Sequence, residues 1–310
     1  MRIFMPCKTG KEILRAAQEA LTRRGHSCTL YPFSTAEKMR TALDKGNYDI
    51  ALSTEAQVQC KIKDTAVRKV YLAPNLFCGE KLGRTDCALY LIPHEELSFD
   101  FINAGAREKK VQLCGIPLPS QYLQCTPKAQ ACRSLGLCAD RKTFTLFADG
   151  VSGNEIKSTV RAAQRLCPET QILVMAGDAG RRKMWQSAFA DLQNVFVLEP
   201  DVALGMSVGD AVFLPAVTSL LCTAARLEKV CILLHVPTLR CRRNAAFADA
   251  HGMAFSGKTA ADNVSYAQRL LDGERLRQMM FRAQEKNICP QPEQTLIKAL
   301  EALGENEKKH

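Results

Sequence analysis

The chain has 310 residues, of which 46% are hydrophobic and 24% charged, and its formal net charge is +10. This length and composition exclude a disordered chain and indicate a globular protein of two ordinary domains. No apolar run approaches the roughly 18 residues of a membrane-spanning helix, and the N-terminus lacks a signal-peptide core. We therefore expect a cytoplasmic protein whose basic surface can contact the inner face of an anionic membrane peripherally.

The cysteines, histidines and aromatic residues argue against three further classes of protein. Fourteen cysteines are scattered singly without a C-x-x-C pair, which indicates free thiols in a reducing compartment. Neither these cysteines nor the five histidines have the spacing of zinc ligands, so we expect no metal. A single tryptophan provides few stacking platforms, so we expect no nucleic-acid partner. The plain alternative for the charge is a soluble basic surface without a specific partner, and the sequence does not predict the oligomeric state.

Strand and helix patterns alternate along the first 119 residues. Helices are predicted at 11–24, 35–45 and 95–104, each followed by a glycine, the residue favoured just after a helix. Strands are predicted at 2–6, 27–33, 48–53, 68–73, 87–92 and 110–117. Three prolines, at 117, 119 and 127, interrupt the alternation and cannot continue a sheet interior, so residues 120–141 are predicted to be a linker, with one short helix in "KAQACRSLG".

A second alternating series occupies residues 142–310. Its predicted strands are at 143–148, 170–176, 194–199, 210–214, 229–235 and 252–256. Its predicted helices are at 155–166, 180–191, 218–228, 242–250, 260–271, 273–286 and 291–303. Short apolar strands alternating with helices predict an α/β fold with two Rossmann-like parallel-sheet domains, 1–119 and 142–310, facing a cleft. Ligands in such sheets bind beyond the carboxyl ends of the strands.

Three segments carry a resemblance to a known family. They are "LYLIPHEELSFDFINAGAREKKVQLCGIPLPSQYL" (89–123), "MSVGDAVFLPAVTS" (206–219) and "VPTLRCRRNAAFADAHGMAFS" (236–256). The chain resembles glycosyltransferase family 28, in its branch of diacylglycerol glucosyltransferases and monogalactosyldiacylglycerol synthases, with degenerate active-site motifs. The resemblance implies the GT-B architecture, in which residues 1–119 form the acceptor-side domain and residues 142–310, with the C-terminal helices, form the nucleotide-sugar domain.

The resemblance implies a donor site at the strand ends of the second domain. Family glycine loops that approach the diphosphate correspond here to Gly150, Ser152 and Gly153, and to a turn containing Thr218 and Ser219. The family's ribose-binding acid corresponds to Cys222, which cannot make the same charge-assisted bond. Further donor-binding candidates are Gly177 and Asp178, Asn244, and a diphosphate-pairing set of arginines at 240, 242 and 243. For each of them, an ordinary helix cap, turn or solvated face is the structural alternative.

The acceptor side lacks the family's expected base. In the turn after the first strand, Gly10 matches the family pattern while Lys11 replaces its histidine. A lysine with the ordinary pKa of about 10.4 is a poor base at neutral pH. His94 matches another family position, so Lys11 and His94 are the catalytic candidates.

Three functions follow from these residues. The first is a glycosyltransferase of glycolipid biosynthesis that moves a sugar from a UDP-sugar to a lipid or membrane-associated acceptor, without a metal or other cofactor. The second is a catalytically inactive homologue, a pseudoenzyme that binds a nucleotide, lipid or protein. The third is a related enzyme of nucleotide-sugar metabolism, such as an epimerase or hydrolase.

Overall fold

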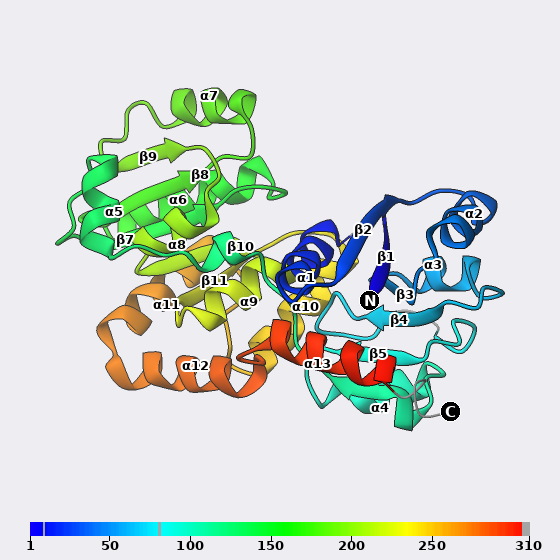
Figure 1. The fold of residues 1–310 in the computed structure, drawn as a ribbon. Coiled ribbons are helices and arrows are strands. Elements are labelled where there is room, and N and C mark those ends of the chain that lie inside the picture. Colours follow the sequence, from blue (N-terminus) through cyan, green and yellow to red (C-terminus); the bar gives the residue numbers. More distant parts are fainter. Residues whose placement is uncertain (9, 80–81, 306–310) are drawn as a thin grey trace. The chain divides into compact units, whose positions relative to one another are not determined.

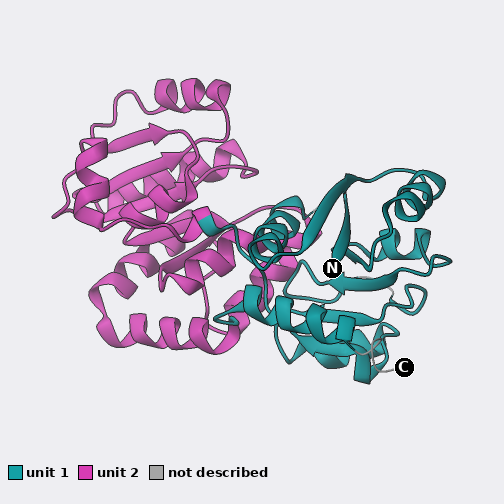
Figure 2. Ribbon diagram, viewed as in Figure 1, with its two compact units in different colours: residues 1–120, 288–310 teal, residues 121–287 magenta. Residues whose placement is uncertain are grey.

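The computed structural model describes residues 1–8, 10–79 and 82–305, drawn in Figure 1. The chain divides into two compact units, residues 1–120 with 288–310 and residues 121–287, which Figure 2 colours separately. Each unit is built around one sheet in which every strand pair is parallel. The prediction of two Rossmann-like parallel-sheet domains is therefore confirmed.

The first unit has a six-stranded sheet in the order β2-β1-β3-β4-β5-β6. The chain moves outward from β1 to β2 and then returns to the other side of β1 with β3, so the topological switch point lies between β1 and β3. Its elements are β1 (Arg2–Cys7), α1 (Lys11–Arg23), β2 (Ser27–Pro32), α2 (Ala36–Gly46), β3 (Ile50–Ser53), α3 (Ala56–Lys61), β4 (Arg68–Leu72), β5 (Leu89–Ile92), α4 (Leu97–Asn103), η1 (Glu108–Lys110), β6 (Val111–Leu113), η2 (Ser120–Leu123, crossing into the second unit) and α13 (Pro292–Glu305).

Apolar side chains on both faces of this sheet explain why its strands read as continuous hydrophobic runs. Phe4 of β1 is fully buried with Met39 of α2 and Val58 of α3 in one cluster. Another cluster places Tyr71 of β4 and Phe101 of α4 together, with ring centroids 6.1 Å apart. Helices on both faces are what a buried parallel sheet requires.

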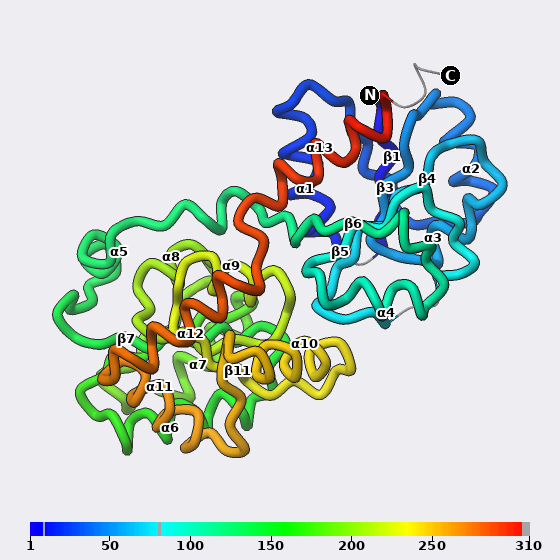
Figure 3. Tube along the Cα trace, turned by 90° about the horizontal axis from the view of Figure 1, so that it is seen from below, coloured from blue at the N-terminus to red at the C-terminus, as the bar shows by residue number. Residues whose placement is uncertain are grey.

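The C-terminal helix belongs to the first unit, which differs from the expectation that residues 142–310 form one domain. Figure 3 shows α13 running along α1, and the two helices are in contact. The apolar face of α13 is buried, including Leu296 and Leu300. At its start, the Glu293 carboxylate accepts the Leu118 N–H at 3.0 Å. The helix joins the first unit because its apolar face packs on α1, which lies far away in the sequence.

The second unit has a five-stranded sheet in the order β11-β10-β7-β8-β9. All side chains of β7, β8, β10 and β11 are buried, as expected for strands covered on both faces. Its elements are α5 (Lys128–Leu135), β7 (Thr143–Phe147), α6 (Gly153–Leu166), β8 (Gln171–Met175), α7 (Ala179–Ala188), β9 (Val195–Leu198), α8 (Val202–Val208), β10 (Ala211–Pro215), α9 (Thr218–Arg226), β11 (Val230–Leu234), α10 (Leu239–Ala250), α11 (Ala260–Asp272) and α12 (Glu274–Asn287).

Some predicted elements differ from the structure in detail. The strand expected at 252–256 is reduced to a single parallel bridge between Phe255 and Ile232. The short helices α3 and α8 were not predicted. Within the described part of the chain, none of the helices combines the length and the apolar character needed to cross a membrane.

The cysteines are free thiols that differ widely in accessibility. Cys125 and Cys138 are exposed, while Cys222 and Cys231 are fully buried. Burial raises the pKa of the Cys222 thiol to about 12, and it also raises that of Cys231. Because the thiolate is the reactive form, we expect a soluble thiol reagent at pH 8 to label Cys125 and Cys138 long before the buried pair. Peptide mass spectrometry of a time course measures this, and labelling of Cys222 as fast as Cys125 would contradict the packing of α9.

Candidate functional site

The carboxyl edge of the second sheet brings together the residues predicted to bind the donor. β7, β8, β10 and β11 are parallel, and each runs through a short turn into a helix, so these turns meet at one edge. The predicted residues lie in these turns or in the helices that follow them: Gly150 and Ser152 in the turn after β7, Gly153 at the start of α6, Gly177 and Asp178 in the turn after β8, Thr218 and Ser219 at the start of α9, and Asn244 on α10.

The turn after β7 is shaped by a glycine and a helix cap. Gly150 has a φ of +73°, a left-handed conformation that other residues adopt only with strain. The Ser152 hydroxyl accepts the Glu155 N–H at 3.2 Å and so caps α6. Gly153 is the first residue of this helix. The Glu155 carboxylate accepts the His235 N–H at 3.3 Å, which joins this turn to the one after β11.

The turn after β8 carries an ion-pair network. Asp178 caps α7 by accepting the Arg181 N–H at 2.8 Å. The Arg181 guanidinium also lies 3.3 Å from Asp149 and 3.7 Å from Asp178, so it joins the turns after β7 and β8. A side chain on Gly177 would begin 2.7 Å from the Asp149 carboxylate, which explains the glycine. Asp149 was not predicted, although its place directly after a buried strand is the signal that could have identified it.

The turn after β10 is fixed from inside the protein by Asn244. This residue is fully buried, and its side-chain amide donates to the Ala216 carbonyl and to the Thr218 hydroxyl, both at 3.0 Å. Thr218 and Ser219 are each only 3% exposed. The geometry therefore gives Asn244 a structural role in holding the start of α9. Cys222, predicted from the resemblance to stand in place of a ribose-binding acid, is fully buried on α9 and does not reach the surface.

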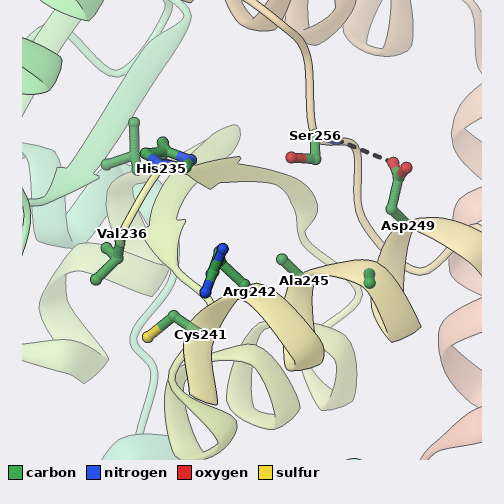
Figure 4. A pocket seen from close by; sticks show the side chains of 9 residues that line it. His235, Val236, Cys241, Arg242, Ala245, Asp249 and Ser256 are labelled. Atoms are coloured by element: carbon green, nitrogen blue, oxygen red, sulfur yellow. Dashed lines mark hydrogen bonds between the residues drawn. The ribbon is translucent and has the colours of Figure 1, made fainter. Parts of the chain in front are cut away.

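A pocket of about 260 Å³ lies beside this edge, within the second unit. Figure 4 shows it between the end of β11, one face of α10 and the segment after Phe255. It is lined by Leu234, His235, Val236, Cys241, Arg242, Ala245, Ala246, Asp249 and Ser256. Of these, the sequence predicted only Arg242, through the basic run "RCRRN". The others were not predicted, because no motif distinguishes them in the sequence.

The first unit places its predicted residues at the carboxyl edge of its own sheet. Gly10, with a φ of +66°, precedes α1, and a side chain there would begin 2.9 Å from the Thr54 hydroxyl. Lys11 is the exposed first residue of α1, and His94, 7% exposed, follows β5. Because β3 and β4 separate β1 from β5, the turns that carry Lys11 and His94 are roughly 14 Å apart. The structure therefore does not bring these two candidates together.

Glu55 is a residue of this edge that the sequence analysis missed. It follows β3, next to the switch point between β1 and β3, and is only 8% exposed. Its carboxylate accepts the Lys8 N–H at 3.0 Å, from the turn between β1 and α1. Together with burial, this carboxylate raises the pKa of the Cys7 thiol at the end of β1. The switch point thus holds a carboxylate where the sequence predicted no base.

No protein-family model and no curated protein matches this chain. Solved structures do match it over nearly the whole length. A putative UDP-N-acetylglucosamine 2-epimerase from Listeria monocytogenes has a TM-score of 0.74 at 11% identity, covering 98% of this chain and 97% of that one. MurG of Acinetobacter baumannii has a TM-score of 0.71 at 11% identity, covering 97% and 99% of the two chains.

A third solved structure is a UDP-N-acetylglucosamine 2-epimerase from Neisseria meningitidis bound to UDP-GlcNAc, with a TM-score of 0.70 at 13% identity. It covers 97% of this chain and 99% of its own. At these identities the likeness concerns the fold. Two parallel-sheet α/β units and end-to-end similarity to these proteins show that the chain has the GT-B fold.

Proposed function

We propose that this chain is a glycosyltransferase that moves a sugar from a UDP-sugar to a lipid or other membrane-associated acceptor. The GT-B fold supports the donor half, as does the similarity to a protein solved with UDP-GlcNAc. The acceptor half is supported by the net charge of +10 and by Phe99 of α4, which is 70% exposed. In the first unit, Glu55 supplies a carboxylate to accept the proton of an acceptor hydroxyl.

The start of α9 supports the donor half of the proposal, because this helix begins without a side-chain cap. At the same edge, α6, α7 and α10 begin with side-chain caps from Ser152, Asp178 and Thr238. The residue before α9 is Val217, which is 38% exposed and supplies no side-chain cap. A helix N-terminus favours negative charge through its backbone N–H groups and dipole. We place the donor diphosphate there.

A pair of substitutions at Val217 tests this placement. Val217→Asn and Val217→Asp both add a side-chain cap, so we expect each to raise the free energy of unfolding by about 1 kcal/mol. We expect V217N to retain UDP binding, while the carboxylate of V217D repels the diphosphate and weakens binding at least about tenfold. Calorimetric titration with UDP and urea unfolding of both variants measure the two effects. Equal UDP affinity in V217N and V217D would place the diphosphate elsewhere.

A catalytically inactive homologue is the second candidate. It is favoured by Lys11 in place of the family's histidine and by the buried Cys222 in place of its acid. An active transferase releases UDP slowly from a UDP-sugar without acceptor and faster when lipid acceptor is added. UDP binding without any release favours the inactive homologue, and conversion of the sugar to an epimer favours the third function considered.

A further inference from the structure

The pocket beside α10 contains two side chains that have no partner among the described residues. The Arg242 guanidinium and the His235 ring line the pocket, and neither forms a hydrogen bond or ion pair with any residue that the structure describes. An arginine presents its donors in a planar fork that matches carboxylate and phosphoryl oxygens. The pocket therefore offers donors for an anionic group from outside the unit.

The opposite end of the pocket has a different chemistry. Asp249 lies seven residues after Arg242 on α10, so the two are roughly 10 Å apart along the helix axis. Figure 4 shows them on either side of Ala245. One Asp249 oxygen accepts the Ser256 N–H at 3.0 Å, which holds the carboxylate in place at the pocket. A fixed carboxylate accepts hydrogen bonds from hydroxyl groups and repels anions.

The dipole of α10 adds to the effect of the two side chains, because it favours an anion at the end of the pocket that holds Arg242. Arg242 lies near the N-terminus of α10, where negative charge is favoured, and Asp249 lies near the C-terminal end. At about 260 Å³ the pocket is smaller than the roughly 300–1,000 Å³ of sites that hold a whole drug-sized ligand. It therefore has room for one ring of a larger ligand, with an anionic group at one end and hydroxyls at the other.

On the basis of the proposed UDP-sugar function, we infer that this pocket binds a sugar ring bearing an anionic oxygen group. The anionic group contacts Arg242 and His235, and ring hydroxyls contact Asp249. That group is either the phosphoryl group attached to the sugar or a carboxylate on the sugar itself. The guanidinium can donate paired hydrogen bonds to the oxygens of either group, and the ligands chosen for the test distinguish the two.

The test compares Arg242→Gln with Arg282→Gln, which removes the same charge from an exposed position on α12 of the same unit, outside the pocket lining. The ligands are glucose, glucose 1-phosphate, glucuronate, UDP-glucose and UDP-glucuronate, each titrated by calorimetry. We expect R242Q to lose about 10- to 100-fold in affinity for the ligands whose anionic group enters the pocket, and R282Q to stay within about twofold of the unchanged protein. His235→Gln is a second variant, with a smaller loss for the same ligands.

The pattern of losses identifies the anionic group. Losses for glucose 1-phosphate and both UDP-sugars indicate the phosphoryl group. Losses for glucuronate and UDP-glucuronate, with UDP-glucose unaffected, indicate a carboxylate. If R242Q and H235Q bind every ligand as the unchanged protein does, or if that protein binds none of the five, the inference is overturned. If it binds only the ligands without uridine, and does so through Arg242, the pocket assignment stands and the proposed UDP-sugar function fails.

Discussion

Replacing Gly115 by alanine is expected to lower the free energy of unfolding of the first unit by about 2–5 kcal/mol. Gly115 has a φ of +87°, and a side chain there would begin 2.4 Å from Cβ of Cys289 and 3.0 Å from Cβ of Pro292. The penalty combines left-handed strain of about 1–2 kcal/mol with overpacking of about 1–3 kcal/mol. Urea unfolding followed by circular dichroism measures it.

Gly136→Ala is the matched control. Gly136 has a φ of +68°, but nothing lies within 4 Å of the position its side chain would take. Its replacement carries only the strain, about 1–2 kcal/mol. If G115A and G136A lose the same stability, the segment before α13 yields to the added methyl group. The close packing of the "GIP" turn on that segment would then be contradicted.

Introducing an acid at Cys222 is expected to destabilise the second unit by about 3–5 kcal/mol at neutral pH rather than to create a ribose-binding residue. Cys222 is fully buried, and the same desolvation that raises the pKa of its thiol to about 12 would act on a glutamate. A buried carboxylate without a partner is costly in its charged form. Cys222→Glu therefore tests whether this position of α9 can hold a ribose-binding acid.

The pH dependence distinguishes a buried charge from simple misfit. Burial would raise the pKa of the carboxyl introduced in C222E above its unfolded value of about 4.3. The folded state then binds more protons than the unfolded state, so the stability of C222E falls as pH rises above about 4. Urea unfolding at pH 5 and pH 8 measures this, with Cys222→Ser as a control that adds no charge. A C222E protein that is as stable as C222S at both pH values, and binds UDP more tightly, would contradict the buried position.

The strands of both sheets were predictable because they are buried on both faces and therefore appear as short continuous apolar runs. β3 and β5 are fully buried, and both lie within the predicted ranges. Helix α3 was missed because its six residues are too short for a clear helical period. Helix α8 was missed because Gly205 interrupts a seven-residue segment between two strands.

The candidate site was predictable only where it follows from a strand end. The turns after β7, β8 and β10 could be located because a buried strand ends just before each of them. The sequence could not predict that the Asn244 side chain points into the protein and donates to the Ala216 carbonyl. An amide at that position can either hold a turn or bind a ligand. The pocket depends on three segments meeting in space, which carry His235, then Arg242 and Asp249, and then Ser256, and no local pattern encodes that meeting.

The return of α13 to the first unit has a consequence for biosynthesis. The second unit, residues 121–287, is contiguous in the chain, whereas the first is interrupted by it. During translation the N-terminal segment therefore emerges first yet lacks the helix that covers α1 until residues 292–305 have left the ribosome. The nascent first unit must expose the apolar surface of α1 throughout synthesis of the second, an interval in which a chaperone is expected to bind it.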